Sequence, residues 1–276
     1  MTLSVAWHSK EGIYFASDSR VSRGGKYSDY GVKVIPVQIR IFNPGKDDTS
    51  PSIAFEKTYG MCFAGDFAGS AIIQNFFSVT LQRLQYVPSF STISFESICR
   101  VVNNLYREVS IKLQEEIDNE CIDFFFSGFC PLNKKIMLAK FYIDYGNNVD
   151  QYEPQYEVID YESDPEPIYY IGSGESAYAI HLDINKEKPI STRPMYALKT
   201  LIDSKSSNSV GGNIQAGNFS SSHEFYMLGI YDKSINQQGH IESVHYYYSG
   251  LDMNSDLFET CTSGLMVIGN YIDLSQ

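Results

Sequence analysis

The apolar residues change their spacing several times along the chain, and the order of those changes constrains the fold more than any other feature. Leu3 to Ala16 alternates or runs apolar around a turn at residues 9–12, which predicts two strands joined as a hairpin. Further strands are predicted at Val32–Phe42 and Thr58–Ala64, with a polar loop, Gly45–Pro51, between them. The chain therefore opens with strands alone.

Two segments with helical spacing follow this first group of strands. From Ala68 to about Gln85 the apolar residues lie on one broad helical face. Ser94–Ile117 repeats that pattern, and it begins with Ser94-Phe95-Glu96-Ser97, a weaker variant of the capping box. We expect a pair of long helices here.

The second half of the chain repeats the order of strands and then helices. More strands are predicted at Ile122–Gly128, Ile136–Ile143, Tyr156–Tyr161 and Ile168–Gly172. Ser173–Leu182 and Pro194–Ser204 predict a second helix pair, and a Ser/Gly/Asn-rich stretch at 205–222 precedes a strand at Phe225–Ile230. Runs of one element type, rather than strict alternation, favour an α+β fold with antiparallel sheets. With no internal repeat and no long linker, we expect a single domain spanning residues 1–276.

The charge balance and the cysteines exclude several classes of function. The chain has 21 Lys and Arg against 33 Asp and Glu, a net charge of −12, and no basic run, so nucleic acid and anionic membranes are unsuitable partners. The first seven residues carry no targeting signal and no apolar stretch is long enough to span a membrane, so we expect a cytoplasmic protein. Five widely spaced cysteines and no Cys/His cluster predict reduced core thiols, no metal and no cofactor.

Thr2 is a candidate nucleophile because removal of Met1 would expose its α-amine. A hydroxyl is a weak nucleophile near neutral pH and needs a base beside it. A free α-amine, with a reference pKa of about 8, can relay a proton from the hydroxyl of the same residue. The alternative is that Thr2 only permits removal of the initiator methionine.

Short motifs after Thr2 connect it with a known family. Asp18-Ser19-Arg20 closes the second predicted strand, Lys33 stands at the start of the third, and Ala64-Gly65 stands before the first predicted helix. Phe126-Ser127-Gly128-Phe129 and Gly172-Ser173-Gly174 follow in order. In this order and spacing the chain resembles the proteasome β-subunit family of N-terminal-nucleophile (Ntn) hydrolases, including its Anbu-type bacterial relatives, over roughly residues 2–212.

The resemblance implies a role for six residues. Thr2 is implied as nucleophile, Lys33 as a fixed positive charge that favours the alkoxide, and Asp18 as the group that holds Lys33. The Gly65 amide is implied as oxyanion donor, Ser173 as a contact of the Thr2 amine or hydroxyl, and Arg20 as a brace for the loop. From the residues alone, Asp18 and Arg20 could equally close a turn, Lys33 could be a solvated strand end, and Arg40 and Lys26 are rival cations.

One part of the family pattern differs in this chain. Peptidases of the family commonly carry Asp and, three residues later, Ser before a Gly-Gly pair. Counted back from Gly211-Gly212, the matching residues here are Ser207 and Val210. Ser209 or Asp203 could substitute for the missing groups.

By resemblance the fold is a four-layer αββα sandwich, and the activity is hydrolysis of peptide bonds through an acyl-enzyme on Thr2. The resemblance also implies a homo-oligomer, as a ring or a spiral, that encloses the active site, with any ATPase unfoldase being a separate chain. Two alternatives stay open: a catalytically silent scaffold subunit, and an amidohydrolase acting on small molecules on the same fold.

Overall fold

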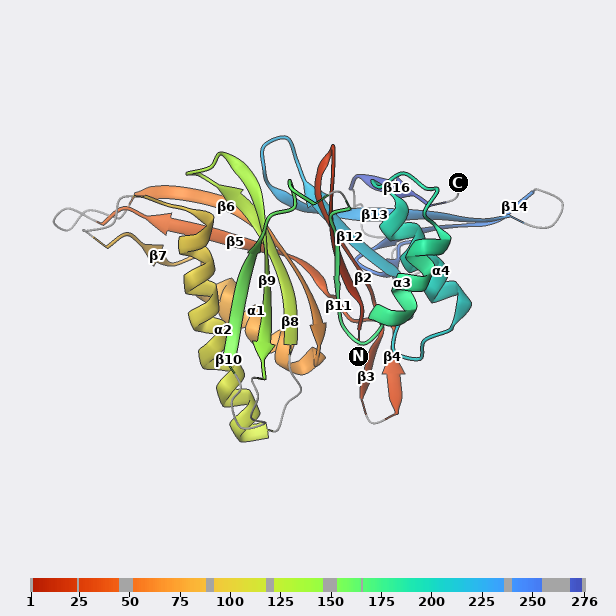
Figure 1. Cartoon of the computed structure of the whole chain (residues 1–276), viewed down its shortest axis with the longest axis horizontal. Helices are drawn as coiled ribbons and strands as arrows, with labels where there is room; N and C mark the ends of the chain where they lie inside the picture. The colour runs from red at the N-terminus through yellow and green to blue at the C-terminus, as the bar shows by residue number, and fades with distance from the viewer. Residues whose placement is uncertain are drawn as a thin grey trace, which may run out of the picture. The chain divides into compact units, whose positions relative to one another are not determined.

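The computed structural model describes residues 2–23, 25–44, 52–87, 92–117, 122–145, 153–164, 166–235, 240–254 and 269–274. The chain forms two compact units. The first contains residues 1–35, 166–218 and 227–276, and the second contains residues 36–165 and 219–226. Each unit is built on its own sheet, with helices packed beside it (Figure 1).

The first unit is built on an eight-stranded sheet in which β11, β1, β2, β12, β13, β14 and β15 are successive neighbours and β16 pairs with β13. The strands are β1 Ser4–Ser9, β2 Gly12–Asp18, β11 Ile168–Ile171, β12 Ile214–Phe219, β13 Phe225–Ile235, β14 Ile241–Tyr248, β15 Leu251–Asp252 and β16 Tyr271–Asp273. The β1–β2 hairpin places Ser4 opposite Ser17, and β12 continues the sheet with Ile214 opposite Asp18. A separate two-stranded ribbon, β3 Val21–Arg23 with β4 Lys26–Ser28, leaves the end of β2.

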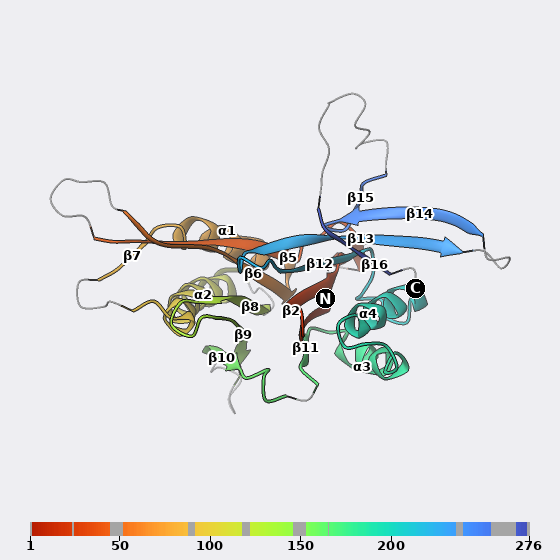
Figure 2. The same ribbon diagram turned by 90° about the horizontal axis from the view of Figure 1, so that it is seen from above.

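Two adjacent helices, α3 Glu175–Ile184 and α4 Arg193–Ser204, complete the first unit, and both views show them side by side (Figures 1 and 2). Pro194 stands in the first turn of α4, where its missing N–H costs no helical hydrogen bond. Tyr178 of α3 is fully buried and donates its hydroxyl to the Pro194 carbonyl. Trp7 stacks on Tyr14 in the buried interior, as expected for a core residue.

The second unit is built on a six-stranded sheet with the strand order β10, β9, β8, β6, β5 and β7. Its strands are β5 Val34–Phe42, β6 Ile53–Gly65, β7 Leu84–Gln85, β8 Ile122–Cys130, β9 Lys135–Asp144 and β10 Glu153–Ile159. The β6–β8, β8–β9 and β9–β10 pairs are antiparallel, whereas β5 and β7 are parallel.

Helices α1 Phe67–Thr80 and α2 Phe95–Ile117 pack on this sheet through aromatic side chains. Phe77 of α1 and Tyr106 of α2 both contact Phe124 of β8, which stacks in turn on Phe141 of β9. Asp66 caps α1 by accepting a hydrogen bond from the Gly69 amide. The capping box expected at Ser94 is present, because Ser94 and Ser97 each accept a hydrogen bond from the other's backbone amide.

The predicted order of strand groups and helix pairs is confirmed, but several boundaries differ. The strand predicted at Thr58–Ala64 begins at Ile53, and the strand predicted at Phe225–Ile230 ends at Ile235. The first helix ends at Thr80 rather than near Gln85, because Leu84 and Gln85 pair with Ile41 and Phe42 as strand β7. The stretch 205–222, expected to be irregular, contains the fully buried strand β12. The ribbon β3–β4 was not anticipated, since its second strand is exposed throughout and has no buried face to signal it.

The expected core thiols are confirmed for Cys62, Cys99 and Cys130, which are buried. Burial raises the pKa of the Cys99 thiol well above its ordinary value. Cys121 and Cys261 lie outside the described residues, as does the predicted loop at 45–51. In the described part of the chain, no helix has the length and apolar character required to cross a membrane.

Candidate functional site

Asp18, the last residue of β2, is the centre of a buried cluster in the first unit. Its side chain is completely buried and accepts four hydrogen bonds. Oδ1 accepts from the Leu3 amide at 3.0 Å and from Lys33 Nζ at 2.9 Å. Oδ2 accepts from the amides of Arg20 and Gly211, both at 3.1 Å. One carboxylate thus joins the start of β1, the end of β2 and the Gly211-Gly212 loop to a buried cation.

Lys33 is as deeply buried as Asp18, since the side chains of this ion pair are 1% and 0% exposed respectively. An ion pair removed from water is tolerated only when hydrogen bonds and charge compensate both partners. The rival cations are placed differently: Lys26 lies on exposed β4, and Arg40 forms a half-exposed pair with Glu56 in the second unit. Of the three predicted candidates, Lys33 is therefore the buried cation.

Thr2 lies immediately before this cluster and is 2% exposed. The amide of the next residue, Leu3, binds Asp18, and the Leu3 carbonyl accepts from Ser17 Oγ at 2.7 Å. Ser17 Oγ also accepts a hydrogen bond from Ser4. The backbone N–H and carbonyl of Leu3, the residue that follows Thr2, are therefore both hydrogen-bonded, and the N–H is bonded to the carboxylate that also binds Lys33.

Arg20 lies on the outer side of the cluster. Its guanidinium binds the Asp29 carboxylate through two hydrogen bonds of 2.7 and 3.1 Å, and it stacks on the Tyr27 ring at 4.1 Å. The hydrogen bond to Asp29 raises the pKa of Arg20 above its ordinary value, although burial opposes this. A Cβ on Gly211 would lie 2.3 Å from Arg20 Cζ, so the glycine loop packs directly against this guanidinium.

The other predicted residues lie at the following places. Gly174, at the start of α3, packs against Leu3 and Val210, but its neighbour Ser173 is exposed. No hydrogen bond within the described residues joins Ser173 to Thr2. Gly65 is the last residue of β6, with a φ of 120°. Gly65 belongs to the second unit and is not a member of the cluster around Asp18.

The two positions that differ from the family pattern do not form a polar site. Val210 is buried, and a Cβ added at Gly174 would lie 2.6 Å from Val210 Cγ2. Ser207 Oγ hydrogen-bonds Ser209 Oγ at 2.9 Å and accepts from the Ser209 amide at 3.3 Å, so the two hydroxyls are bonded to each other within the loop. Asp203, the other possible substitute, forms an ion pair with Lys199 on α4.

Sequence reasoning missed Ser17 and Gln215, both completely buried. Ser17 binds the Leu3 carbonyl, and Gln215 binds the backbone around Lys33. A lone polar residue in a strand is ordinarily interpreted as facing water, so the sequence pattern gave no signal for either.

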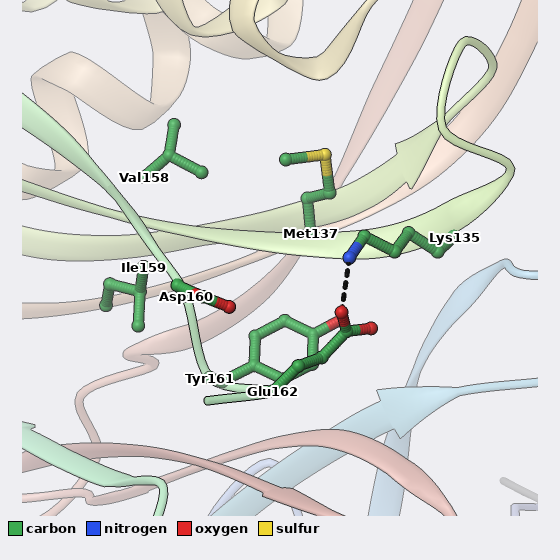
Figure 3. A pocket seen from close by; sticks show the side chains of 7 residues that line it. All are labelled: Lys135, Met137, Val158, Ile159, Asp160, Tyr161 and Glu162. Atoms are coloured by element: carbon green, nitrogen blue, oxygen red, sulfur yellow. Dashed lines mark hydrogen bonds and ion pairs between the residues drawn. The ribbon is translucent and has the colours of Figure 1, made fainter. Parts of the chain in front are cut away.

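A small hollow of about 180 Å³ in the second unit has none of the predicted site residues in its lining. Figure 3 shows the ion pair between Lys135 and Glu162 beside the apolar side chains of Met137, Val158 and Ile159. Burial raises the pKa of Tyr161 to about 12, so the phenol is neutral near pH 7. Among the described residues, no group of His, Cys, Asp or Glu is arranged to hold a metal ion.

Comparison with solved structures identifies the fold. Anbu (ancestral beta-subunit) from Yersinia bercovieri matches with a TM-score of 0.53 at 17% identity, over 82% of this chain and 87% of that chain. The Pseudomonas aeruginosa Anbu complex, described as a helical assembly, matches with a TM-score of 0.51 at 19% identity, over 93% and 89% of the two chains. Anbu from Hyphomicrobium sp. strain MC1 matches with a TM-score of 0.51 at 17% identity, over 94% and 91%.

No protein-family model matches the sequence, and no curated protein matches it. The solved structures therefore carry the comparison. They confirm the resemblance to proteasome-type β-subunits at the level of the fold, a mixed α and β architecture.

Proposed function

We propose that this chain is an N-terminal threonine amide hydrolase in which Thr2, after loss of Met1, cleaves peptide bonds through an acyl-enzyme. The buried Asp18–Lys33 pair carries the proposal. A hydroxyl nucleophile needs a fixed positive charge or a base close to it, and a lysine desolvated against a four-fold hydrogen-bonded carboxylate is such a charge. An ion pair on the surface does not carry this desolvation cost.

Each residue of the cluster then has a chemical role. Thr2 Oγ attacks the amide carbonyl while its proton passes to the α-amine of the same residue. The Lys33 ammonium stabilises the negative charge that develops on Oγ, and Asp18 keeps the ammonium in place. The tetrahedral intermediate collapses when the leaving nitrogen takes the proton from the α-amine, which leaves an ester on Thr2. Water then cleaves the ester and restores the hydroxyl.

Further groups complete the proposed site. The Gly65 amide would donate to the oxyanion, in the four-layer αββα sandwich that the sequence resemblance implies. Ser173 would contact the Thr2 amine or hydroxyl, and Arg20 would brace the loop through Asp29. The whole of residues 1–276 would form one Ntn-hydrolase domain.

The proposed enzyme would be a cytoplasmic homo-oligomer that encloses its sites in a ring or a spiral, with any ATPase unfoldase on a separate chain. The similar Pseudomonas aeruginosa structure, which is described as a helical assembly, supports the spiral homo-oligomer. Polypeptides or peptides would be the substrates.

A second candidate function, a catalytically silent scaffold subunit, is favoured by residues 207–210, where the family pattern has the groups that support the amine. There the expected acid is Ser207, which pairs with Ser209, and the expected hydroxyl is the buried apolar Val210. A protein without support for the Thr2 amine could keep the fold and lose the reaction.

The intact mass of the purified protein, before and after incubation with a peptide epoxyketone, separates the two functions. This reagent cross-links the α-amine and Oγ of an N-terminal threonine. The hydrolase is expected to lack Met1 and to gain one adduct, and Thr2→Ala is expected to gain none while assembling like the wild type. A retained Met1 with no adduct would contradict the hydrolase and support the scaffold.

A further inference from the structure

Gln215 is a completely buried amide on β12, and among the described residues its side chain bonds only to backbone groups of the segment that carries Lys33. Oε1 accepts from the Lys33 amide at 2.9 Å and from the Val34 amide at 3.3 Å. Nε2 donates to the Gly31 carbonyl. One side chain therefore binds three backbone groups within four consecutive residues.

The segment needs such a partner because Gly31 to Lys33 is not part of a strand. It connects ribbon β3–β4 to β5, yet Gly31, Lys33 and Val34 are buried. A buried backbone amide that lacks an acceptor costs about 1–3 kcal/mol, so nearly all such groups find partners in native proteins. Gln215 takes the place that a neighbouring strand would ordinarily occupy.

The position of Gln215 also links it to Asp18. The β2–β12 register places Ile214 opposite Asp18 and Gln215 opposite Ser17. On the other side, Gly250 has a φ of +81°, and a Cβ there would lie 3.2 Å from Gln215 Nε2. The amide is thus confined between the sheet and the β14–β15 turn, which restricts it to one orientation toward Lys33.

We propose that Gln215 is a positioning residue for Lys33: by holding the backbone of residues 31–34, it fixes the ammonium on Asp18 beside Thr2. This inference rests on the proposed function of Thr2. Gln215 does not touch the reacting atoms, and it acts through the placement of a charge. Because displacement of a catalytic group by about 1 Å can reduce a rate about 100-fold, the contribution of Gln215 to turnover is measurable.

The test compares Gln215→Met with Asn218→Met in the full-length protein. Methionine keeps the length of glutamine and removes its hydrogen bonds. Asn218 is the matched control, since it lies three residues later on β12, is 9% exposed, and its Oδ1 has no hydrogen-bond partner among the described residues. Each variant is compared with wild type at the same interval below its own melting temperature, which separates positioning from loss of folded protein.

Hydrogen exchange of a peptide spanning residues 31–35 is the first readout, because it needs no catalysis. Gln215→Met is expected to speed exchange at the Lys33 and Val34 amides at least about tenfold, whereas Asn218→Met leaves it at the wild-type rate. Unchanged exchange in Gln215→Met would overturn the inference whatever the activity of the protein.

Hydrolysis of a fluorogenic peptide amide is the second readout. Gln215→Met is expected to lower kcat/KM about 10- to 100-fold and to move the acidic limb of its pH profile to higher pH, because the charge beside Thr2 is displaced. An unchanged pH profile, with a loss of kcat/KM that only matches the loss of folded protein, would indicate a structural role alone and overturn the inference. If wild type shows no Thr2-dependent turnover, the proposed function fails, and the exchange data still decide whether Gln215 holds Lys33.

Discussion

Two groups of residues near Leu3 are built in different ways: the charged side, Asp18 with Lys33, and the side formed by residues 207–210. On one side Asp18 and Lys33 form a buried ion pair in which the carboxylate accepts four hydrogen bonds. On the other side Val210 packs on Gly174, and Ser207 pairs with Ser209. The charged side has the polar groups that activation of a hydroxyl requires, whereas the side formed by residues 207–210 is satisfied by packing. The two groups therefore differ in kind: one is a buried network of charge and hydrogen bonds, and the other combines apolar packing with a local pair of hydroxyls.

The largest effect is expected on the charged side, from Asp18→Asn. Removing the carboxylate leaves a buried ammonium without its counter-charge. It also replaces one carboxylate oxygen by an NH2 group, which faces hydrogen-bond donors and cannot accept from them. Loss of one partner of a buried pair destabilises a protein by about 3–5 kcal/mol. Urea unfolding monitored by circular dichroism measures this free energy.

Asp29→Asn is the matched control for that measurement. Asp29 also pairs with a cation of the cluster, Arg20, but its side chain is 34% exposed. We expect it to cost no more than about 1 kcal/mol, since solvent screens the pair. Equal costs for the two variants would mean that burial does not distinguish the charged side.

The charged side is also the part of the site that could be predicted from the sequence. Asp18 and Lys33 stand in short motifs whose order identifies the fold, and the structure places both in one cluster. Val210 and Ser207 were found as departures by counting back from Gly211-Gly212, and the structure shows what replaces the missing groups. The positions of Thr2 and Ser173 relative to substrate remain predictions.

The parts that could not be predicted depend on contacts between distant segments. Gln215 alternates with Ile214 and Ala216, and period-two alternation assigns such a residue to a solvent face. All six residues of β12 are buried, so the rule fails there. The end of α1 at Thr80 was missed for a similar reason, because β7 exists only through its pairing with β5. Local sequence contains neither contact.

An intermediate effect is expected on the side formed by residues 207–210, from Val210→Ser. The loss of buried apolar surface is expected to cost about 1–2 kcal/mol, measured as a lower melting temperature. The new hydroxyl stands where the family pattern has one that supports the amine, so under the proposed function turnover of a peptide amide is expected to rise several-fold. Val210→Ala has the same loss of packing without the hydroxyl. Equal turnover in the two variants would show that support of the amine does not limit this protein.

The smallest effect is expected for an ion pair of the second unit, Lys57–Glu224, which serves as a reference for the comparison. Lys57 Nζ donates to Glu224 Oε1 at 2.7 Å, and the Thr58 amide donates to Oε2 at 2.6 Å. Burial alone would raise the pKa of Glu224, but these hydrogen bonds outweigh it and lower the pKa below its ordinary value. The ionised carboxylate therefore adds stability above the pKa that glutamate has in the unfolded chain, about 4.3, and loses it as the pH falls through the lower folded-state pKa.

Glu224→Gln is accordingly expected to cost less than about 1 kcal/mol at pH 7, because both side chains of the pair are a quarter or more exposed, at 25% and 36%. The cost should shrink at acidic pH, where the wild-type glutamate is protonated as well. Urea unfolding at pH 7 and at about pH 3 measures both values. A cost at pH 7 close to that of Asp18→Asn would contradict the argument, since an exposed pair and a buried one would then stabilise the fold equally. A small, pH-dependent cost would instead assign the larger effect at Asp18 to the burial of its charge beside Thr2.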